Sequence, residues 1–216
     1  MSYLLLITHS TALFPLGIFL WSWKTRRDPA SILMFIKFIY VVTFSLMYHS
    51  YDVSSINSIT EHYDIWTLLD GYASTSLIFT TTLYSLRVRE PQFYITANAF
   101  DTMILVIYLY DSVWFLTTWV LVLSCSVIFL FKWRTVWRYI LKYYFISFFT
   151  VACGIGAAIN FTIAVQTYNE VNSKYIIYHS IWHCFIFSTA GFGSLLRFKL
   201  DEELYPINRR NTLDSI

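Results

Sequence analysis

Three histidines and one aspartate stand inside apolar segments of this chain, where ionisable side chains are costly unless paired, bound to a metal or facing water. They are His49, Asp70, His179 and His183. His179 and His183 are four residues apart, so on a helix their imidazoles share one face, and Ser45 and His49 have the same spacing. Because neutral imidazoles suit tetrahedral zinc, the sequence predicts a Zn2+ site with His49, His179 and His183 as ligands.

Asp70 and Ser45 leave two interpretations of this site open. In a catalytic site, water takes the fourth zinc position and its pKa falls to about 7, which makes it able to attack an amide or ester carbonyl. Asp70 would then orient the water, and Ser45 would hold the hydroxide or the developing oxyanion. In a closed structural site, Asp70 would itself be the fourth ligand and no reaction would follow.

Four other ionisable residues are given no part in the site. His9 has no partner of this kind, and His62 lies in a loop beside Glu61, so we expect solvation or local pairing for both. Asp101 is in the middle of an apolar segment and shares its depth with no histidine, so we expect it to make a buried hydrogen bond. Lys37 is near the inner end of its segment, and we expect its amine to extend to the membrane surface.

The segments that must position these residues are long and apolar. Hydrophobic residues make up 57% of the 216 residues and charged residues 13%, and the apolar runs approach the ~20 residues that span a bilayer. We predict an all-α integral membrane protein with seven transmembrane helices in one domain, residues 1–200, followed by a short tail, residues 201–216. The predicted spans are Tyr3–Trp23, Ser31–Tyr51, Trp66–Leu86, Phe93–Tyr110, Val113–Phe131, Tyr139–Gln166 and Ile176–Leu196.

The basic residues predict the orientation of these spans. Nearly all of them fall in alternate loops, beginning with Lys24, Arg26 and Arg27 after the first span, whereas Lys174 falls on the other side. The positive-inside rule therefore places the N-terminus outside and the tail in the cytoplasm. The net charge of +2 reflects topology, and no nucleic-acid partner is expected. This orientation puts the predicted zinc site in the outer leaflet.

Small residues gather in the sixth predicted span, at Gly154, Gly156, Ala157 and Ala158. Such a patch is typical of close packing between transmembrane helices. All three cysteines also lie within predicted spans, so no disulfide framework is expected.

Three stretches resemble a known family. Residues 45–52 read SLMYHSYD, residues 70–74 read DGYAS, and residues 178–183 read YHSIWH. In this order they look like the myomaker family, within a zinc-containing superfamily that includes alkaline ceramidases and the progestin and adiponectin receptors. The resemblance covers the second to the seventh predicted span. It implies a zinc site surrounded by Ser45, His49, Asp70, His179 and His183.

The resemblance implies that the protein promotes fusion of muscle precursor cells (myoblasts) at the plasma membrane. Its expected partners are membrane lipids, with a homodimer or a separate fusion protein left open. The last residues, 211–216, lack the cysteine cluster found in vertebrate myomakers, so tail palmitoylation is not implied. Asp70 looks more like the hydrolase-type relatives. The alternative function is therefore a zinc-dependent lipid amidase or esterase, ceramidase- or phospholipase-like, and a receptor for a lipid-like ligand is a third hypothesis.

Overall fold

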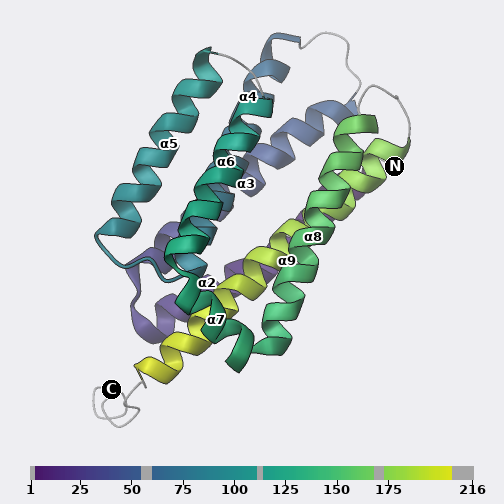
Figure 1. Cartoon of the computed structure of the whole chain (residues 1–216). Helices are drawn as coiled ribbons and strands as arrows, with labels where there is room; N and C mark the ends of the chain where they lie inside the picture. Colours follow the sequence, from purple (N-terminus) through teal and green to yellow (C-terminus); the bar gives the residue numbers. More distant parts are fainter. Residues whose placement is uncertain (1–2, 55–59, 111–113, 168–172, 206–216) are drawn as a thin grey trace, which may run out of the picture.

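The computed structural model describes residues 3–54, 60–110, 114–167 and 173–205, and this part of the chain is all-helical, as predicted. In chain order its helices are α1 (Tyr3–Thr8), the 3-10 helix η1 (His9–Ala12), α2 (Leu13–Arg26), α3 (Pro29–Ser54), α4 (Thr60–Ser85), α5 (Gln92–Tyr110), α6 (Trp114–Phe131), α7 (Trp133–Lys142), α8 (Tyr144–Thr167) and α9 (Ser173–Leu204). The last helix, α9, is central to the bundle (Figure 1), because it packs against α1, η1, α2, α4 and α8.

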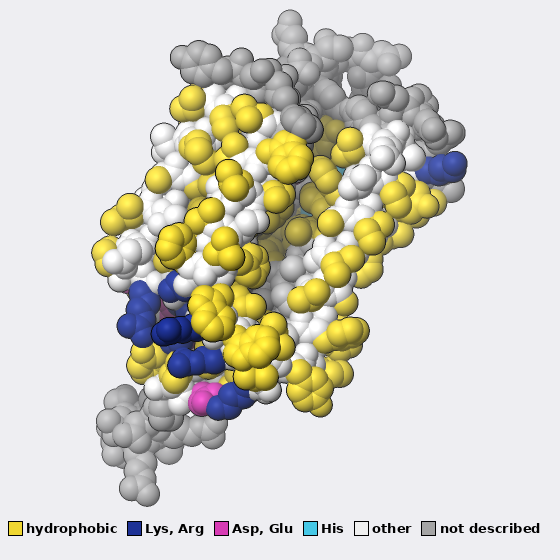
Figure 2. Space-filling model, viewed as in Figure 1, with side chains coloured by type: hydrophobic (Ala, Val, Ile, Leu, Met, Phe, Trp, Pro, Cys, Tyr) yellow, Lys and Arg dark blue, Asp and Glu magenta, His cyan; other side chains and the backbone are white. Residues whose placement is uncertain are grey.

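Several helices are long and apolar enough to cross a membrane. They are the stretches Pro29–His49 in α3, Gln92–Leu109 in α5 and Tyr144–Thr167 in α8. A fourth candidate joins Leu116–Phe131 of α6 to α7, although these two helices are bent by 75°. Figure 2 shows apolar side chains over much of the face of the bundle that is in view, as expected where lipid replaces water. The chain is therefore a helical membrane protein.

Two predicted spans are interrupted. The first is broken by η1, which separates α1 from α2. The sixth was expected to begin at Tyr139, but Tyr139 belongs to α7, and α8 begins at Tyr144. The reason is that α7 is amphipathic: Arg134, Arg138 and Lys142 recur every four residues beside exposed tryptophans, a pattern that favours the membrane interface over its hydrocarbon interior.

Aromatic rings hold the core together. The rings of Phe19 and Phe38 lie 5.3 Å apart, and Phe19 meets Tyr84 edge to face at 5.4 Å. Phe38 also contacts Phe187, at 6.0 Å. All four side chains are buried. These contacts tie α2, α3, α4 and α9 into one unit, which fixes the relative positions of the helices that carry the histidines.

Asp101 and Lys37 form a partly buried ion pair between α5 and α3. The Lys37 amine lies 2.7 Å from Asp101 Oδ2 and donates to Ser76 and Thr80 of α4, at 2.9 Å each. Ser76 in turn donates to Asp101 Oδ1 at 2.6 Å. Asp101 is hydrogen-bonded inside the bundle, as expected, although its side chain is only partly buried. The expectation that Lys37 extends to the surface is wrong, because the paired carboxylate offsets the cost of burying its charge.

The small residues of α8 pack against α9, as predicted. A Cβ added at Gly156 would lie 3.0 Å from the Phe185 ring, and Ala157 is buried. By contrast, a Cβ at Gly17 of α2 would meet nothing within 4 Å.

We therefore expect Gly156→Leu to destabilise the protein by about 1–3 kcal/mol, because an overpacked contact forces the helices apart. Gly17→Leu is the control and should leave stability unchanged or slightly raised. Thermal melting of both purified variants in detergent would measure the difference. Equal melting temperatures for the two would show that α8 and α9 tolerate separation at this point.

Candidate metal centre

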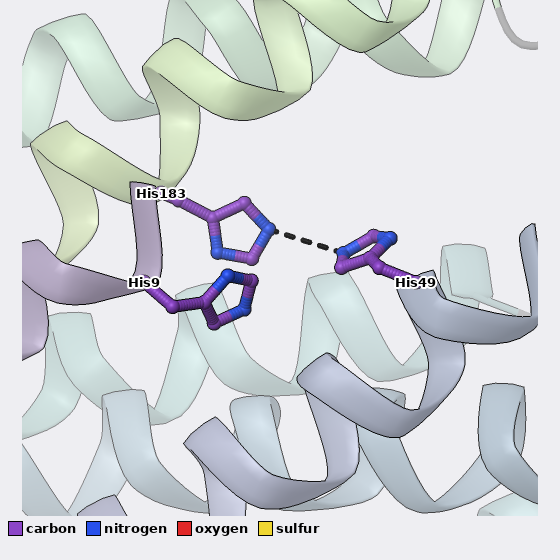
Figure 3. Close-up of side chains that lie close together, drawn as sticks. All are labelled: His9, His49 and His183. Atoms are coloured by element: carbon purple, nitrogen blue, oxygen red, sulfur yellow. Dashed lines mark hydrogen bonds between the residues drawn. The ribbon is translucent and has the colours of Figure 1, made fainter. Parts of the chain in front are cut away.

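Three buried histidines from distant parts of the chain meet in one place (Figure 3). His9 lies in η1, His49 near the end of α3, and His183 in the first half of α9. Their side chains are 5%, 0% and 2% exposed. His9 reaches this place because η1 interrupts the first helix at that residue. Since η1 packs against α9, His9 lies beside the helix that carries His183.

The geometry of these three imidazoles suits a metal ion. One ligand nitrogen from each of His9, His49 and His183 lies within 4.8 Å of the others. His49 Nε2 and His183 Nε2 are 3.3 Å apart, and two nitrogens bound to one tetrahedral zinc would be about 3.3 Å apart, given zinc–nitrogen bonds of about 2.0 Å. The ring centroids of His9 and His183 are 4.2 Å apart. The residues present therefore fit a bound metal.

Several buried ring nitrogens around the cluster have no hydrogen-bond partner. Within the described part of the chain, His49 Nδ1, His183 Nδ1 and His179 Nε2 make no hydrogen bond. A buried polar atom without a partner costs about 1–3 kcal/mol. A metal held by Nε2 of His49 and Nε2 of His183 would leave their Nδ1 atoms unpartnered, so of these three nitrogens only His179 Nε2 could become a ligand of the same ion.

His179 lies beside the cluster, as its spacing from His183 predicts. Its ring centroid is 4.9 Å from that of His49 and 4.8 Å from that of His183. Its side chain is 9% exposed. The closest set of three nitrogens nevertheless includes His9 in place of His179. The ligand set of His49, His179 and His183 thus stays a prediction, with His49 and His183 common to both sets.

The expectation that His9 has no partner is wrong. We expected solvation or local pairing for His9, but its ring lies beside those of His49 and His183. A signal for it was present, however: His9 lies near the outer end of the first predicted span, at the depth assigned to the other site histidines. The side chain of His62, the other histidine set aside, is outside the described part of the structure.

Asp70 and Ser45 are both buried, and they lie close to each other. Asp70 is 7% exposed in α4, and Ser45 is 1% exposed, one turn before His49 in α3. The hydroxyls of Ser45 and Ser74 lie beside the Asp70 carboxyl. Asp70 Oδ1 and Ser45 Oγ nevertheless lack a well-formed hydrogen bond to any described residue. Both atoms are available to a water molecule or a ligand, and their proposed roles remain predictions.

A mainly apolar cavity of about 90 Å³ reaches one of the histidines, His183. Ser45 and His183 line it together with apolar side chains of α3, α4 and α9, among them Phe38, Leu77, Phe187 and Ala190. Figure 2 shows a hollow in the surface between α6 and α8, which pack on α4 and α9 respectively. The histidine cluster therefore borders apolar space suited to hydrocarbon.

A family model matches residues 1–184, which include every residue of the candidate site. The chain belongs to the DUF3522 family. That family is described as a protein of unknown function. No curated protein matches the chain. Membership of the DUF3522 family assigns no activity, so a function must be argued from the site itself.

Proposed function

We propose that this chain is a seven-span plasma-membrane protein of the myomaker type, which promotes fusion of myoblasts through a zinc centre in its outer leaflet. In this topology the spans are α1 with α2, then α3, α4, α5, α6, α8 and α9, with the N-terminus outside. The observation that carries the proposal is that His183 and Ser45 line an apolar cavity. A concave apolar site with a few convergent polar groups is typical of ligand binding, and the ligand at this depth is a lipid.

The histidines would hold the zinc ion. His49 and His183 are two of its ligands, and His9 or His179 is the third. Zinc would supply a Lewis acid and a water of lowered pKa. Asp70 and Ser45 would hold polar groups of the lipid beside the metal, while the cavity holds hydrocarbon. Remodelling of outer-leaflet lipids, by a homodimer or with a second fusion protein, would follow from such binding.

A second candidate function is lipid hydrolysis at the same site. It is favoured by Asp70 Oδ1 and Ser45 Oγ, which are buried and free of well-formed hydrogen bonds to described residues. Asp70 can accept a hydrogen bond from an attacking water. Ser45 can donate one to the oxyanion that develops on an amide or ester carbonyl.

Filling the cavity tests the fusion proposal. Ala190 is 8% exposed and lines the cavity, so Ala190→Phe should occupy it and abolish most mixing of cytoplasmic dyes between fibroblasts that express the protein. Ala99→Phe is the matched control, because Ala99 is exposed on α5. Surface levels of both variants must equal those of the wild type. Mixing by Ala190→Phe at the wild-type level would contradict a role for the cavity.

Lipid turnover separates the two functions. Purified protein in nanodiscs would be given labelled ceramide and phospholipid, and the products counted by chromatography. Under the hydrolase hypothesis Asp70→Asn should lower turnover by at least about tenfold and leave zinc content unchanged, a loss in the range of one catalytic hydrogen bond. Fusion without turnover by the wild type would favour lipid binding alone.

A further inference from the structure

A second pocket, of about 260 Å³, lies at the other end of the bundle from the histidines. Arg197, which lines it, is 14 residues after His183 on the same helix, α9, and this separation corresponds to about 21 Å along the helix axis. Its charged lining residues are four arginines and three acids, Arg26, Arg87, Arg89, Arg197, Asp28, Glu90 and Asp201. Figure 2 shows lysine and arginine side chains gathered at this end of the molecule.

Two of the arginines are neutralised by the acids. Arg197 contacts Asp28 at 3.0 Å and Asp201 at 3.3 Å, and it also donates to the backbone carbonyl of Tyr84 at 3.1 Å. Arg87 pairs with Asp201 as well. Asp28 and Asp201 are thus already engaged, and Arg197 and Arg87 hold the walls of the pocket in place.

The four arginines outnumber the three acids of the lining, and the other two arginines form no ion pair with a described residue. Arg26 donates from Nη1 to the carbonyl of Asp201 at 2.9 Å, while its buried Nε and Nη2 have no hydrogen-bond partner among the described residues. Arg89 donates to the Tyr205 hydroxyl at 3.3 Å, and within the described chain neither arginine makes an ion pair. Glu90 accepts a hydrogen bond from Tyr94.

Lys132, which follows α6, lies close to the positive charges of Arg87 and Arg89. Its amine donates to the carbonyl of Arg87 at 3.3 Å. Burial, and then the charges of Arg89 and Arg87, lower the pKa of this amine. An anion in the pocket would relieve the repulsion among these cations.

We propose that this pocket binds a phosphate group through Arg26 and Arg89. Guanidinium groups bind phosphate oxygens through paired, charge-assisted hydrogen bonds, which lysine cannot reproduce. The volume of about 260 Å³ equals that of roughly eight water molecules, so it accommodates a phosphate with part of the group that carries it. The phosphate comes either from the headgroup of an anionic lipid in the adjacent leaflet or from solution.

The test is a binding titration of the purified full chain in maltoside detergent. The probes are dioctanoyl phosphatidic acid, inorganic phosphate and dioctanoylglycerol, which has the same acyl chains without the phosphate. Arg26→Gln and Arg89→Gln are the variants. Arg134→Gln is the control, because it removes the same charge from an exposed position on α7 outside the pocket.

We expect saturable binding of phosphatidic acid by the wild type and by Arg134→Gln, and affinity at least tenfold weaker in Arg26→Gln and in Arg89→Gln. Binding of phosphatidic acid without inorganic phosphate would identify a lipid headgroup, and comparable binding of both would identify the phosphate group from solution. The proposal is overturned if neither binds saturably, if dioctanoylglycerol binds as tightly, or if Arg134→Gln weakens binding equally. Using two variants guards against misfolding of either one.

Discussion

Purified wild-type protein should contain about one zinc ion per chain, and the His183→Ala variant should contain almost none. His183 belongs to both possible ligand sets, and loss of one of three protein ligands removes most of the affinity, since even residues that only orient ligands are worth about 10–100-fold. Elemental mass spectrometry on protein freed of loosely bound metal would measure the ratio. Ile181→Ala is the matched control, since Ile181 is on the same helix and 36% exposed.

The third ligand can be identified in the same experiment. If His9 completes the site, His9→Ala should lose zinc while His179→Ala retains it, because the close set of nitrogens contains His9. If the predicted set of His49, His179 and His183 is correct, His179→Ala should lose zinc and His9→Ala should retain it. Well-folded wild-type protein without any zinc would refute both ligand sets.

Breaking the ion pair between Lys37 and Asp101 should cause a clear loss of stability. Lys37→Met leaves Asp101 without its cation, and the side chains of the two residues are only 16% and 18% exposed. Removal of one partner of a fully buried pair costs about 3–5 kcal/mol, and because this pair is only partly buried we expect a loss below that range. Asp101→Leu should cost a similar amount for the opposite reason, because it leaves a partly buried ammonium group.

The double variant Lys37→Met/Asp101→Leu separates charge from packing. Replacing both partners with apolar groups is often nearly neutral, so the double variant should melt closer to wild type than either single variant does. Ile36→Met, at an exposed neighbouring position, is the control for substitution in α3. Additive losses in the double variant would indicate that Ser76 and Thr80, rather than the ion pair, hold α3, α4 and α5 together.

Most of the helical architecture could be predicted from hydrophobic runs alone. The start of the sixth predicted span, near Tyr139, could not be predicted in this way. Apolar and basic residues alternate there, and only the bend after α6 shows that Tyr139 belongs to the separate helix α7. Lys37 was misjudged for a related reason. Its position near a predicted span end favoured the surface, whereas its partner Asp101 is far away in the sequence and close only in the folded chain.

The candidate site was predictable where its residues share one helix. The spacing of His179 and His183, and of Ser45 and His49, places each pair on one face without any knowledge of the fold. His9 carries no such local signal, and its place depends on the break at η1 and on packing against α9. The spacing of residues within one helix does not predict which helices contact each other, so the contact between the first and last helices could not be predicted from it.

The origin of the histidines constrains when the centre can form during synthesis. His9 emerges first from the ribosome, and His49 and His183, which meet at 3.3 Å, are 134 residues apart in the chain. The chain is made in order from the N-terminus, so the set of nitrogens is incomplete until α9 has been made and has packed beside η1. Loading of a metal at this centre would therefore come late in biogenesis. It would distinguish fully inserted chains from those whose translation or insertion stopped before the last helix.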